Sequence, residues 1–313
     1  MLIKSADDKS KRLKLLEDLQ KSSVLDKVQR EWLTKQLWSQ RMGIAGERDA
    51  AHYIDNHYRD RNTHAVIHDL RIKVDDEIAQ IDHLVISRGM HFYLLETKSF
   101  NGSLFINEHG EFSVRYGNDA IYGIPSPLEQ SRRHANVLTK LLHRLDMGSG
   151  LRNTPHYHHL VLVHPKSQID RPKTFDTSHV IKADSFATWH EKFQDKISVG
   201  FMFSALLKMR GARALKELAE KVARQHRPTD PLELPEFMAP KAAAPLTRQR
   251  IDDAVRPSSP LVVPAPAPVE AKKRLICTSC GVKITIQEGR FCWNNERRFG
   301  GAQYCREHQR RFS

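Results

Sequence analysis

The chain contains 313 residues, which is enough for one large domain or two smaller ones. Hydrophobic residues make up 40% of it, and no apolar run approaches the roughly 18 residues that a membrane span requires, so no membrane partner is expected. The formal net charge is +13 and the pI is about 9.6, which favours contact with a polyanion but also fits a solvated basic surface.

The first twenty residues mix acidic and basic side chains and lack the uncharged apolar stretch of a secretory signal, so a cytoplasmic location is expected. All four cysteines lie between residues 277 and 305. This clustering favours a metal site in a reducing compartment over a network of disulfides.

Apolar residues recur at spacings of three and four between residues 9 and 41, a pattern typical of amphipathic helix. They predict an N-terminal helical arm over residues 1–40. A second helix is expected to start near Gly43 and to end at about His57, where charged and polar residues indicate a turn.

From His64 onward the chain carries short β-rich runs separated by turn residues. Five runs are predicted to be successive antiparallel strands of one sheet: AVIHDLRI, QIDHLVIS, HFYLLETK, SLFIN and EFSVRY. Pro127 then opens a predicted amphipathic helix, and HHLVLVHP at residues 158–165 is expected to return as a buried central strand. With further helices around residues 184–225, this order predicts a mixed α/β (α+β) domain over residues 41–225.

Ten of the fifteen prolines lie between His226 and Lys273, where their fixed φ and missing amide donors oppose both helix and sheet. Residues 226–273 are therefore predicted to form a semi-rigid linker. A small separate module is expected over residues 274–313, and it is strongly basic, because residues 271–313 hold ten Lys or Arg against three Glu.

Two of the predicted strands carry acidic residues in otherwise apolar surroundings. Asp82 lies on one, and Glu96 follows fourteen residues later on the next, with Lys98 on the same strand face as Glu96. If the strands pair, the two carboxylates come together into an oxygen-rich site of the kind that Mg²⁺ prefers. Lys98 could then orient a water molecule and balance charge on a phosphate, which is the chemistry of phosphodiester hydrolysis.

Glu47, in the preceding predicted helix, could add a third carboxylate, and the neighbouring glycines would allow a close approach of backbone or phosphate. A solvated strand face or a plain salt bridge would also explain an Asp on one strand and Glu-x-Lys on another. The apolar neighbours of these residues favour the metal interpretation, because charges in buried strands need a partner.

Four motifs in consecutive order then resemble a known family: GIAGE, IDHLVIS, YLLETKSFNG and PLEQSRRHANVL, between residues 43 and 138. Together they are similar to the nuclease-related domain, or NERD, of the restriction-endonuclease-like PD-(D/E)xK superfamily, with a motif core at about residues 41–150. The resemblance implies a mixed sheet flanked by helices.

By this resemblance Asp82 and Glu96 hold Mg²⁺ (or Mn²⁺), Lys98 is the catalytic lysine and Glu47 is the helix carboxylate that joins the site. Gln130 matches the glutamine of the following helix. His134 lies one turn further along, so both side chains could point to one face, toward the scissile phosphate. Helix-surface polarity is the alternative for both, and it applies more to His134 than to Gln130. Surface or structural roles are also expected for the neighbouring histidines at positions 156, 158 and 159.

The cysteine spacing predicts a zinc site. Cys277-x2-Cys280 and Cys305-x2-His308 are two ligand pairs separated by 24 residues, and a short hairpin could bring both pairs to one tetrahedral Zn²⁺. Cys292 remains an alternative fourth ligand. The segment resembles the topoisomerase-type zinc finger that accompanies some NERD proteins, in which the last pair is usually Cys-x2-Cys.

Aromatic and basic residues alternate within this module, which is typical of surfaces that stack on bases beside phosphate-neutralising charge. The candidate nucleic-acid contacts are Arg290, Trp293, Arg297 and Arg298. They predict non-specific binding to DNA, with single-stranded DNA included.

The predicted function is therefore a metal-dependent nuclease acting on DNA, assisted by a zinc module. An alternative is a non-catalytic DNA-binding or regulatory protein that keeps the nuclease fold. The complete set of Glu47, Asp82, Glu96 and Lys98 argues against it, because losing any one would suffice to end catalysis. A third interpretation makes the zinc module a protein-interaction platform.

Overall fold

The computed structural model describes residues 1–59, 61–100, 102–117, 120–147, 154–196, 210–239, 275–300 and 302–310. The chain divides into two compact units, Met1–Ala244 and Pro245–Ser313. None of the helices within the described ranges is long and apolar enough to cross a membrane.

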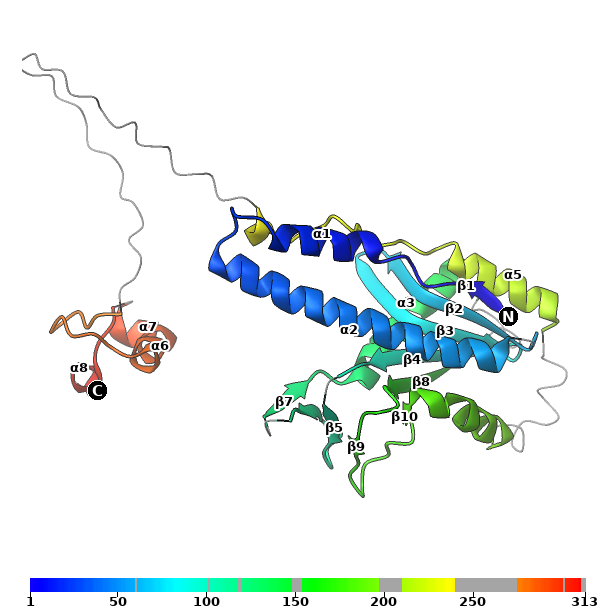
Figure 1. Cartoon of the computed structure of the whole chain (residues 1–313). Helices are drawn as coiled ribbons and strands as arrows, with labels where there is room; N and C mark the ends of the chain where they lie inside the picture. The colour runs from blue at the N-terminus through cyan, green and yellow to red at the C-terminus, as the bar shows by residue number, and fades with distance from the viewer. Residues whose placement is uncertain are drawn as a thin grey trace, which may run out of the picture. The chain divides into compact units, whose positions relative to one another are not determined.

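The first unit is built on a six-stranded mixed sheet with the order β1-β2-β3-β4-β8-β10 (Figure 1). Strands β2, β3 and β4 are antiparallel neighbours, whereas β1 runs parallel to β2, and β8 runs parallel to both β4 and β10. The prediction that the strand near residue 158 occupies a central position is confirmed. The strand bounds are Leu2–Lys4 (β1), His64–Val74 (β2), Glu77–Ser87 (β3), His91–Lys98 (β4), His156–Val163 (β8) and Val180–Lys182 (β10).

A second, four-stranded sheet has the order β7-β6-β5-β9. The prediction of one five-stranded sheet is therefore wrong, because β8 takes the edge of β4 that β5 was expected to fill. Apolar residues of β5 and β6, such as Leu104 and Val114, instead pack against Val161 and Val163 of β8. The strands are Ser103–Ile106 (β5), Phe112–Arg115 (β6), Ile121–Ile124 (β7) and Ile169–Asp170 (β9).

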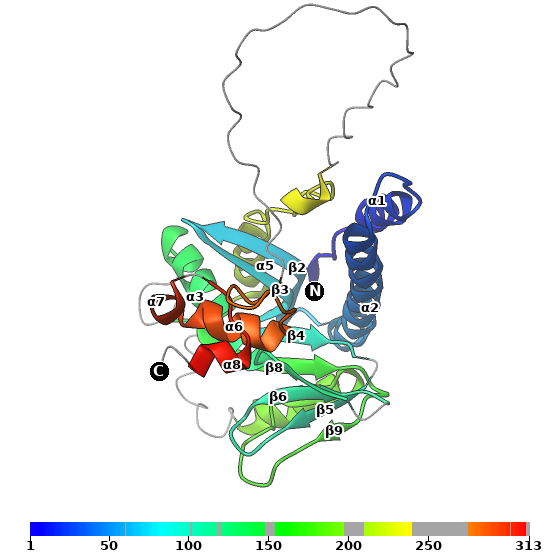
Figure 2. The same cartoon turned by 90° about the vertical axis from the view of Figure 1, so that its left-hand side faces the viewer.

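Helices cover both faces of the six-stranded sheet (Figure 2). Tyr93 and Leu95 of β4 pack toward α2 and the helical residues 186–196 on one face. Phe92 and Leu94 pack toward α3 and α5 on the other face, as the alternation of side chains along a strand requires. The mixed α/β fold with helices flanking the sheet is confirmed. The main helices are Ser10–Gln20 (α1), Lys27–Tyr58 (α2), Pro127–Arg144 (α3) and Ala212–Ala223 (α5), and short 3-10 helices span Ala183–Ser185 and Glu236–Met238.

Helix α2 is one continuous helix of 32 residues that starts at an Asp26–Gln29 capping box. The predicted break near residues 41–43 is therefore wrong. A helical glycine costs only about 1 kcal/mol relative to alanine, and packing along both halves of the helix outweighs that cost. The first half packs Leu33 and Leu37 against α1, and the second half packs Ile54 against the sheet.

Residues 226–239, expected within the proline-rich linker, lie on the first unit. Met238 is buried with leucines of α1 and α2, and the Trp32 and Phe237 rings meet edge to face at 5.4 Å. The Gln29 side chain donates a hydrogen bond to the Phe237 carbonyl at 2.8 Å. The rest of the expected linker, residues 240–273, lies outside the described residues.

Candidate functional site

The pairing of β3 with β4 brings together Asp82, in the middle of β3, and Glu96, near the end of β4. The register pairs His83 with Leu95, which places Asp82 opposite Glu96 across the two antiparallel strands. The Thr97 backbone N–H donates to Oδ2 of Asp82 at 2.8 Å, so the carboxylate is held beside the end of β4. Glu96 is buried and Asp82 is partly exposed. Two facing carboxylates thus sit at the edge of an apolar core.

Lys98 and helix α3 complete this side of the site. The Lys98 ammonium donates to Oε1 of Glu96 at 2.8 Å and to Oε1 of Gln130 at 3.3 Å. One helical turn beyond Gln130, the Nδ1 atom of His134 lies 3.9 Å from Oε2 of Glu96. His134 therefore faces the site with its side chain only 14% exposed, so it shares the face of Gln130, and the alternative of helix-surface polarity does not hold for it.

The electrostatics of the carboxylate pair favour a bound cation. Burial raises the pKa of Asp82 well above its ordinary value, and the negative charges of Glu96 and Glu47 raise it further. Burial also raises the pKa of Glu96, and this outweighs the neighbouring Lys98 ammonium. The anionic forms are thus poorly solvated, and oxygen donors in this condition fit a hard divalent cation such as Mg²⁺.

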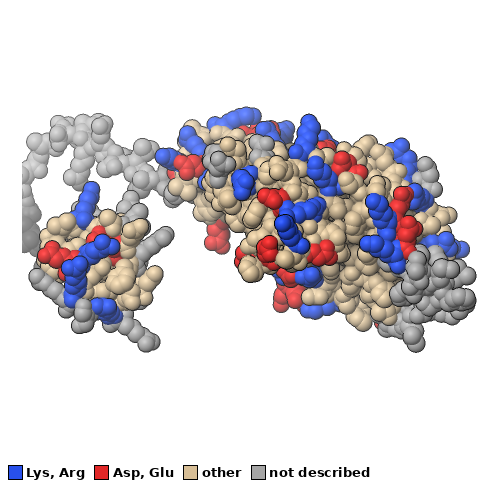
Figure 3. Space-filling model, turned by 90° about the horizontal axis from the view of Figure 1, so that it is seen from below, with Lys and Arg blue, Asp and Glu red and all other residues tan. Residues whose placement is uncertain are grey.

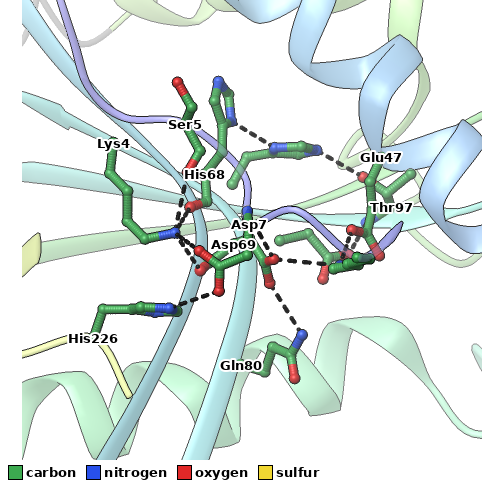
Figure 4. Close-up of polar contacts among 12 residues, drawn as sticks. Lys4, Ser5, Asp7, Glu47, His68, Asp69, Gln80, Thr97 and His226 are labelled. Carbon is green, nitrogen blue, oxygen red and sulfur yellow. Dashed lines mark hydrogen bonds and ion pairs between the residues drawn. The ribbon is translucent and has the colours of Figure 1, made fainter. Parts of the chain in front are cut away.

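Glu47 reaches the site from α2, on the other side of the strands. Gly46 makes this possible, because a Cβ atom at that position would lie 2.6 Å from the Cβ of Ser99, just beyond β4. The Thr97 side chain is also close to Gly46, and Figure 4 shows Glu47 in the same region as Thr97. The structure thus brings together all five residues predicted for the catalytic site: Glu47, Asp82, Glu96, Lys98 and Gln130.

Two residues of the site were missed at the level of the sequence. Lys9 forms an ion pair with Oε2 of Glu47 at 2.7 Å and with Oδ2 of Asp69 at 3.3 Å. Asp69 is buried and has a φ of +50°, an unusual conformation for a residue other than glycine. The β2–β3 register places Asp69 opposite Asp82. For Asp69, the sequence signal was an aspartate in the middle of an apolar strand. For Lys9 the sequence carries no such signal, because its partners are 38 and 60 positions away.

A chain of hydrogen bonds lies beneath the carboxylates. Asp55 of α2 contacts His68 at 3.0 Å, the two buried imidazoles of His68 and His83 meet at 2.8 Å, and His83 contacts Oγ1 of Thr97 at 3.1 Å. Because the Thr97 N–H holds Asp82, this chain fixes one candidate metal ligand from behind.

Other histidines fill structural positions. The rings of His91 and His158 are hydrogen-bonded at 2.9 Å, and the His159 ring contacts the Ser131 hydroxyl at 2.8 Å. His91 and His156 are register partners on β4 and β8 and stack with centroids 5.2 Å apart.

The two glycines of α2 give a matched pair of predictions. Gly46→Ala is expected to lower the free energy of unfolding by about 1–3 kcal/mol, because the new methyl group would push α2 away from Ser99. Gly43→Ala is expected to raise it by about 0.5–1 kcal/mol, since outside its chain neighbours and the local backbone of α2 no described atom lies within 4 Å of the new Cβ. Urea unfolding of both variants measures the difference. Equal changes in the two variants would contradict the close contact at Gly46.

A comparison with known protein families matches the part of the chain that contains these carboxylates. Residues 42–164 match the model of the nuclease-related domain, NERD. The chain therefore contains a nuclease-related domain. The match runs from the middle of α2 through β8, so it includes all five predicted catalytic residues and Asp69, but not Lys9. No curated protein and no solved structure matched the chain.

The second unit groups four potential metal ligands. The donor atoms of Cys277, Cys280, Cys305 and His308 all lie within 4.8 Å of one another. Three of the separations are 3.9 Å for Cys280 to Cys305, 3.7 Å for Cys277 to His308 and 3.2 Å for Cys305 to His308. With Zn–S and Zn–N bonds of about 2.3 and 2.0 Å, neighbouring ligands of a tetrahedral ion lie about 3.5–3.8 Å apart. This Cys3His group therefore fits a metal such as zinc.

The local fold explains how the ligands meet. Cys277 and Cys280 lie on a tight turn in which Gly281 has a φ of +69°, next to the bridge between Ile276 and Lys283. Cys305 caps a short helix that carries His308, so this pair comes from a helix start and not from the expected hairpin. Backbone N–H groups around Cys277 outweigh the effect of burial and lower the pKa of its thiol to about 6, which favours the thiolate that a metal requires. The helices of this unit are Ile286–Asn294 (α6), Glu296–Phe299 (α7) and Arg306–Gln309 (α8).

Cys292 lies apart from the ligand group. It is fully buried, and its sulfur accepts hydrogen bonds from the Tyr304 N–H and the Gln309 side chain, both at 3.3 Å. Of the four candidate nucleic-acid contacts, Arg298 is exposed, and its guanidinium lies 5.5 Å from the centre of the Phe299 ring. The side chains of Arg290, Trp293 and Arg297 lie outside the described part of the structure.

Proposed function

We propose that the nuclease-related domain hydrolyses phosphodiester bonds of DNA with a divalent ion, Mg²⁺ or Mn²⁺, held by Asp82 and Glu96. The observation that carries this proposal is the pair of facing carboxylates with the Lys98 ammonium 2.8 Å from Glu96. When bound, the ion would supply Lewis-acid stabilisation of the phosphate and a more acidic water molecule.

The residues of the chain have separate parts in this proposal. Lys98 is fixed between Glu96 and Gln130, so its ammonium is oriented before substrate arrives and can stabilise negative charge that develops on the phosphate. Gln130 and His134, one turn apart on α3, are placed to orient water or a phosphate oxygen. Burial, with further contributions from Arg133 and Lys98, lowers the pKa of His134 to about 4, so this imidazole is neutral at pH 7.

DNA as the substrate is supported by the composition of the second unit and by the Cys3His group, which we propose binds Zn²⁺. On the face of the first unit in Figure 3, Lys and Arg side chains are interspersed with Asp and Glu. We therefore assign much of the non-specific affinity for DNA, single-stranded DNA included, to the basic module and its candidate contacts Arg290, Trp293, Arg297 and Arg298. A cytoplasmic location would keep its thiols reduced.

The test is cleavage of linear, circular and single-stranded DNA by the zinc-loaded chain, with Mg²⁺ or Mn²⁺ added or withheld. We expect metal-dependent cutting by the wild type and none by Asp82→Ala, which removes one carboxylate. We expect this variant to keep its fold and its affinity for DNA. DNA binding without cutting in either metal would instead support a non-catalytic DNA-binding or regulatory protein.

A further inference from the structure

The segment that precedes Lys9 is hydrogen-bonded to the middle of β2 (Figure 4). The Lys4 ammonium donates to the carbonyl oxygens of His68 and Asp69, both at 3.1 Å. The Asp7 N–H donates to Oδ2 of Asp69 at 3.3 Å, and the Asp7 carboxylate contacts His226 at 2.8 Å. The residues that precede Lys9 are therefore anchored to β2 and to His226, although the segment lies outside the matched nuclease-related domain.

Lys9 joins two carboxylates beside the candidate metal site. Its ammonium lies 2.7 Å from Glu47 and 3.3 Å from Asp69, and the Asp69 side chain is only 6% exposed. Burial lowers the pKa of Lys9, but the charges of Glu47 and Asp69 outweigh that effect and raise the pKa above its ordinary value. Lys9 is therefore charged at every pH at which the protein is expected to work.

Carboxylates and ammonium groups divide into two sets. Asp82 and Glu96 form one set, which contacts Lys98 and would hold the divalent ion of the proposed function. Glu47 and Asp69 form the other, which the Lys9 ammonium already bridges. The negative charge of Glu47 raises the pKa of both Asp82 and Glu96, so the two sets interact electrostatically.

The second set, Glu47 and Asp69, can be reached by a cation from solvent. Lys9, Glu47 and Asp69 line a cleft of about 980 Å³ between α1, α2 and residues 228–235. Hydrated metal ions could enter such a space. What opposes their binding is the fixed positive charge of Lys9, which neutralises the oxygen donors and repels a second cation.

We propose that the Lys9 ammonium occupies a second cation position beside the catalytic carboxylates, so that the active site takes a single divalent ion. Lys9 is then a positioning residue that keeps Glu47 in place without a metal. This inference rests on the proposed function, because it assumes that Asp82 and Glu96 bind the catalytic ion.

The test counts Mn²⁺ ions bound by the zinc-loaded full chain at pH 7, using the electron paramagnetic resonance signal of free Mn²⁺. We expect one tightly bound ion in the wild type and two in Lys9→Met, where Glu47 and Asp69 are left without their cation. Lys9→Arg should restore the count of one. Lys11→Met is the matched control, because Lys11 lines the same cleft and is exposed.

The outcomes separate the two proposals. Two tightly bound ions in the wild type, or one in a folded Lys9→Met variant, would overturn the role of Lys9. The double variant Lys9→Met with Glu47→Gln should return to one ion, which excludes a new site created by unfolding. If Asp82→Ala binds as many ions as the wild type, the metal site of the proposed function fails, whatever Lys9 does.

Discussion

Lys98→Met is expected to lower the rate of DNA cleavage by about a hundredfold to ten-thousandfold, the usual contribution of a positioned acid–base or charge-stabilising group. The reason is that the Lys98 ammonium is the cation that α3 fixes beside the carboxylates, at 2.8 Å from Glu96. Mn²⁺ affinity should stay the same or increase, because the variant removes a positive charge from a metal ligand. Single-turnover cleavage and Mn²⁺ titration measure the two effects separately.

Lys140→Met provides the control for Lys98→Met. Lys140 belongs to α3, and its ammonium pairs with Glu77 on an exposed surface, so the substitution makes the same change in net charge away from the site. We expect wild-type cleavage from it. Cleavage by Lys98→Met within tenfold of wild type would show that Lys98 has no catalytic part. Loss of Mn²⁺ binding in that variant would assign it a structural one.

Much of this site follows from local rules. Asp82 and Glu96 lie on sequential antiparallel strands joined by a short turn, so their approach depends only on the register of one hairpin. Lys98 shares the face of Glu96 by the alternation of a strand. Gln130 and His134 are four residues apart in a helix, so they share a face once α3 packs on the sheet.

The roles of Lys9 and Asp69 in the site could not be predicted from such local rules. Lys9 follows β1, which pairs in parallel with β2, and this contact joins segments about sixty residues apart. No periodicity of the sequence encodes it or the ion pair of Lys9 with Glu47. Asp69 looks like an isolated polar residue in an apolar strand until the register places it opposite Asp82. Charged residues brought together by long-range packing are therefore the part of the site that required the three-dimensional structure.

The same contrast holds for the fold. The helices and strands were largely predictable, because the hydrophobic periodicity of α3 and the β-rich runs are strong local signals. The partition of strands into two sheets was not. Whether β5 or β8 pairs with the edge of β4 is decided by packing of Val161 and Val163 against Leu104, a contact between residues more than fifty positions apart.

The Cys3His group leads to the other large expected effect. Forty residues with few buried apolar side chains cannot hold a stable core alone, so most of the folding free energy of this unit would come from the bound metal. Removal of metal by a chelator, or Cys305→Ser, is expected to abolish Zn²⁺ binding and to remove hydrogen-exchange protection from residues 275–310, while the first unit keeps its melting temperature. Zinc analysis and hydrogen exchange measure both effects.

Comparing Cys292→Ala with His308→Ala tests which of these two residues is the fourth metal ligand. The Cys292 sulfur contacts the Tyr304 N–H and the Gln309 side chain, so its loss is expected to cost the module about 1–2 kcal/mol through lost contacts while one Zn²⁺ stays bound. His308→Ala should lose the ion, because its Nδ1 lies 3.2 Å from the Cys305 sulfur within the ligand group. If Cys292→Ala loses Zn²⁺ and His308→Ala retains it, Cys292 is the fourth ligand, and the thiol must leave its buried contacts when the metal binds.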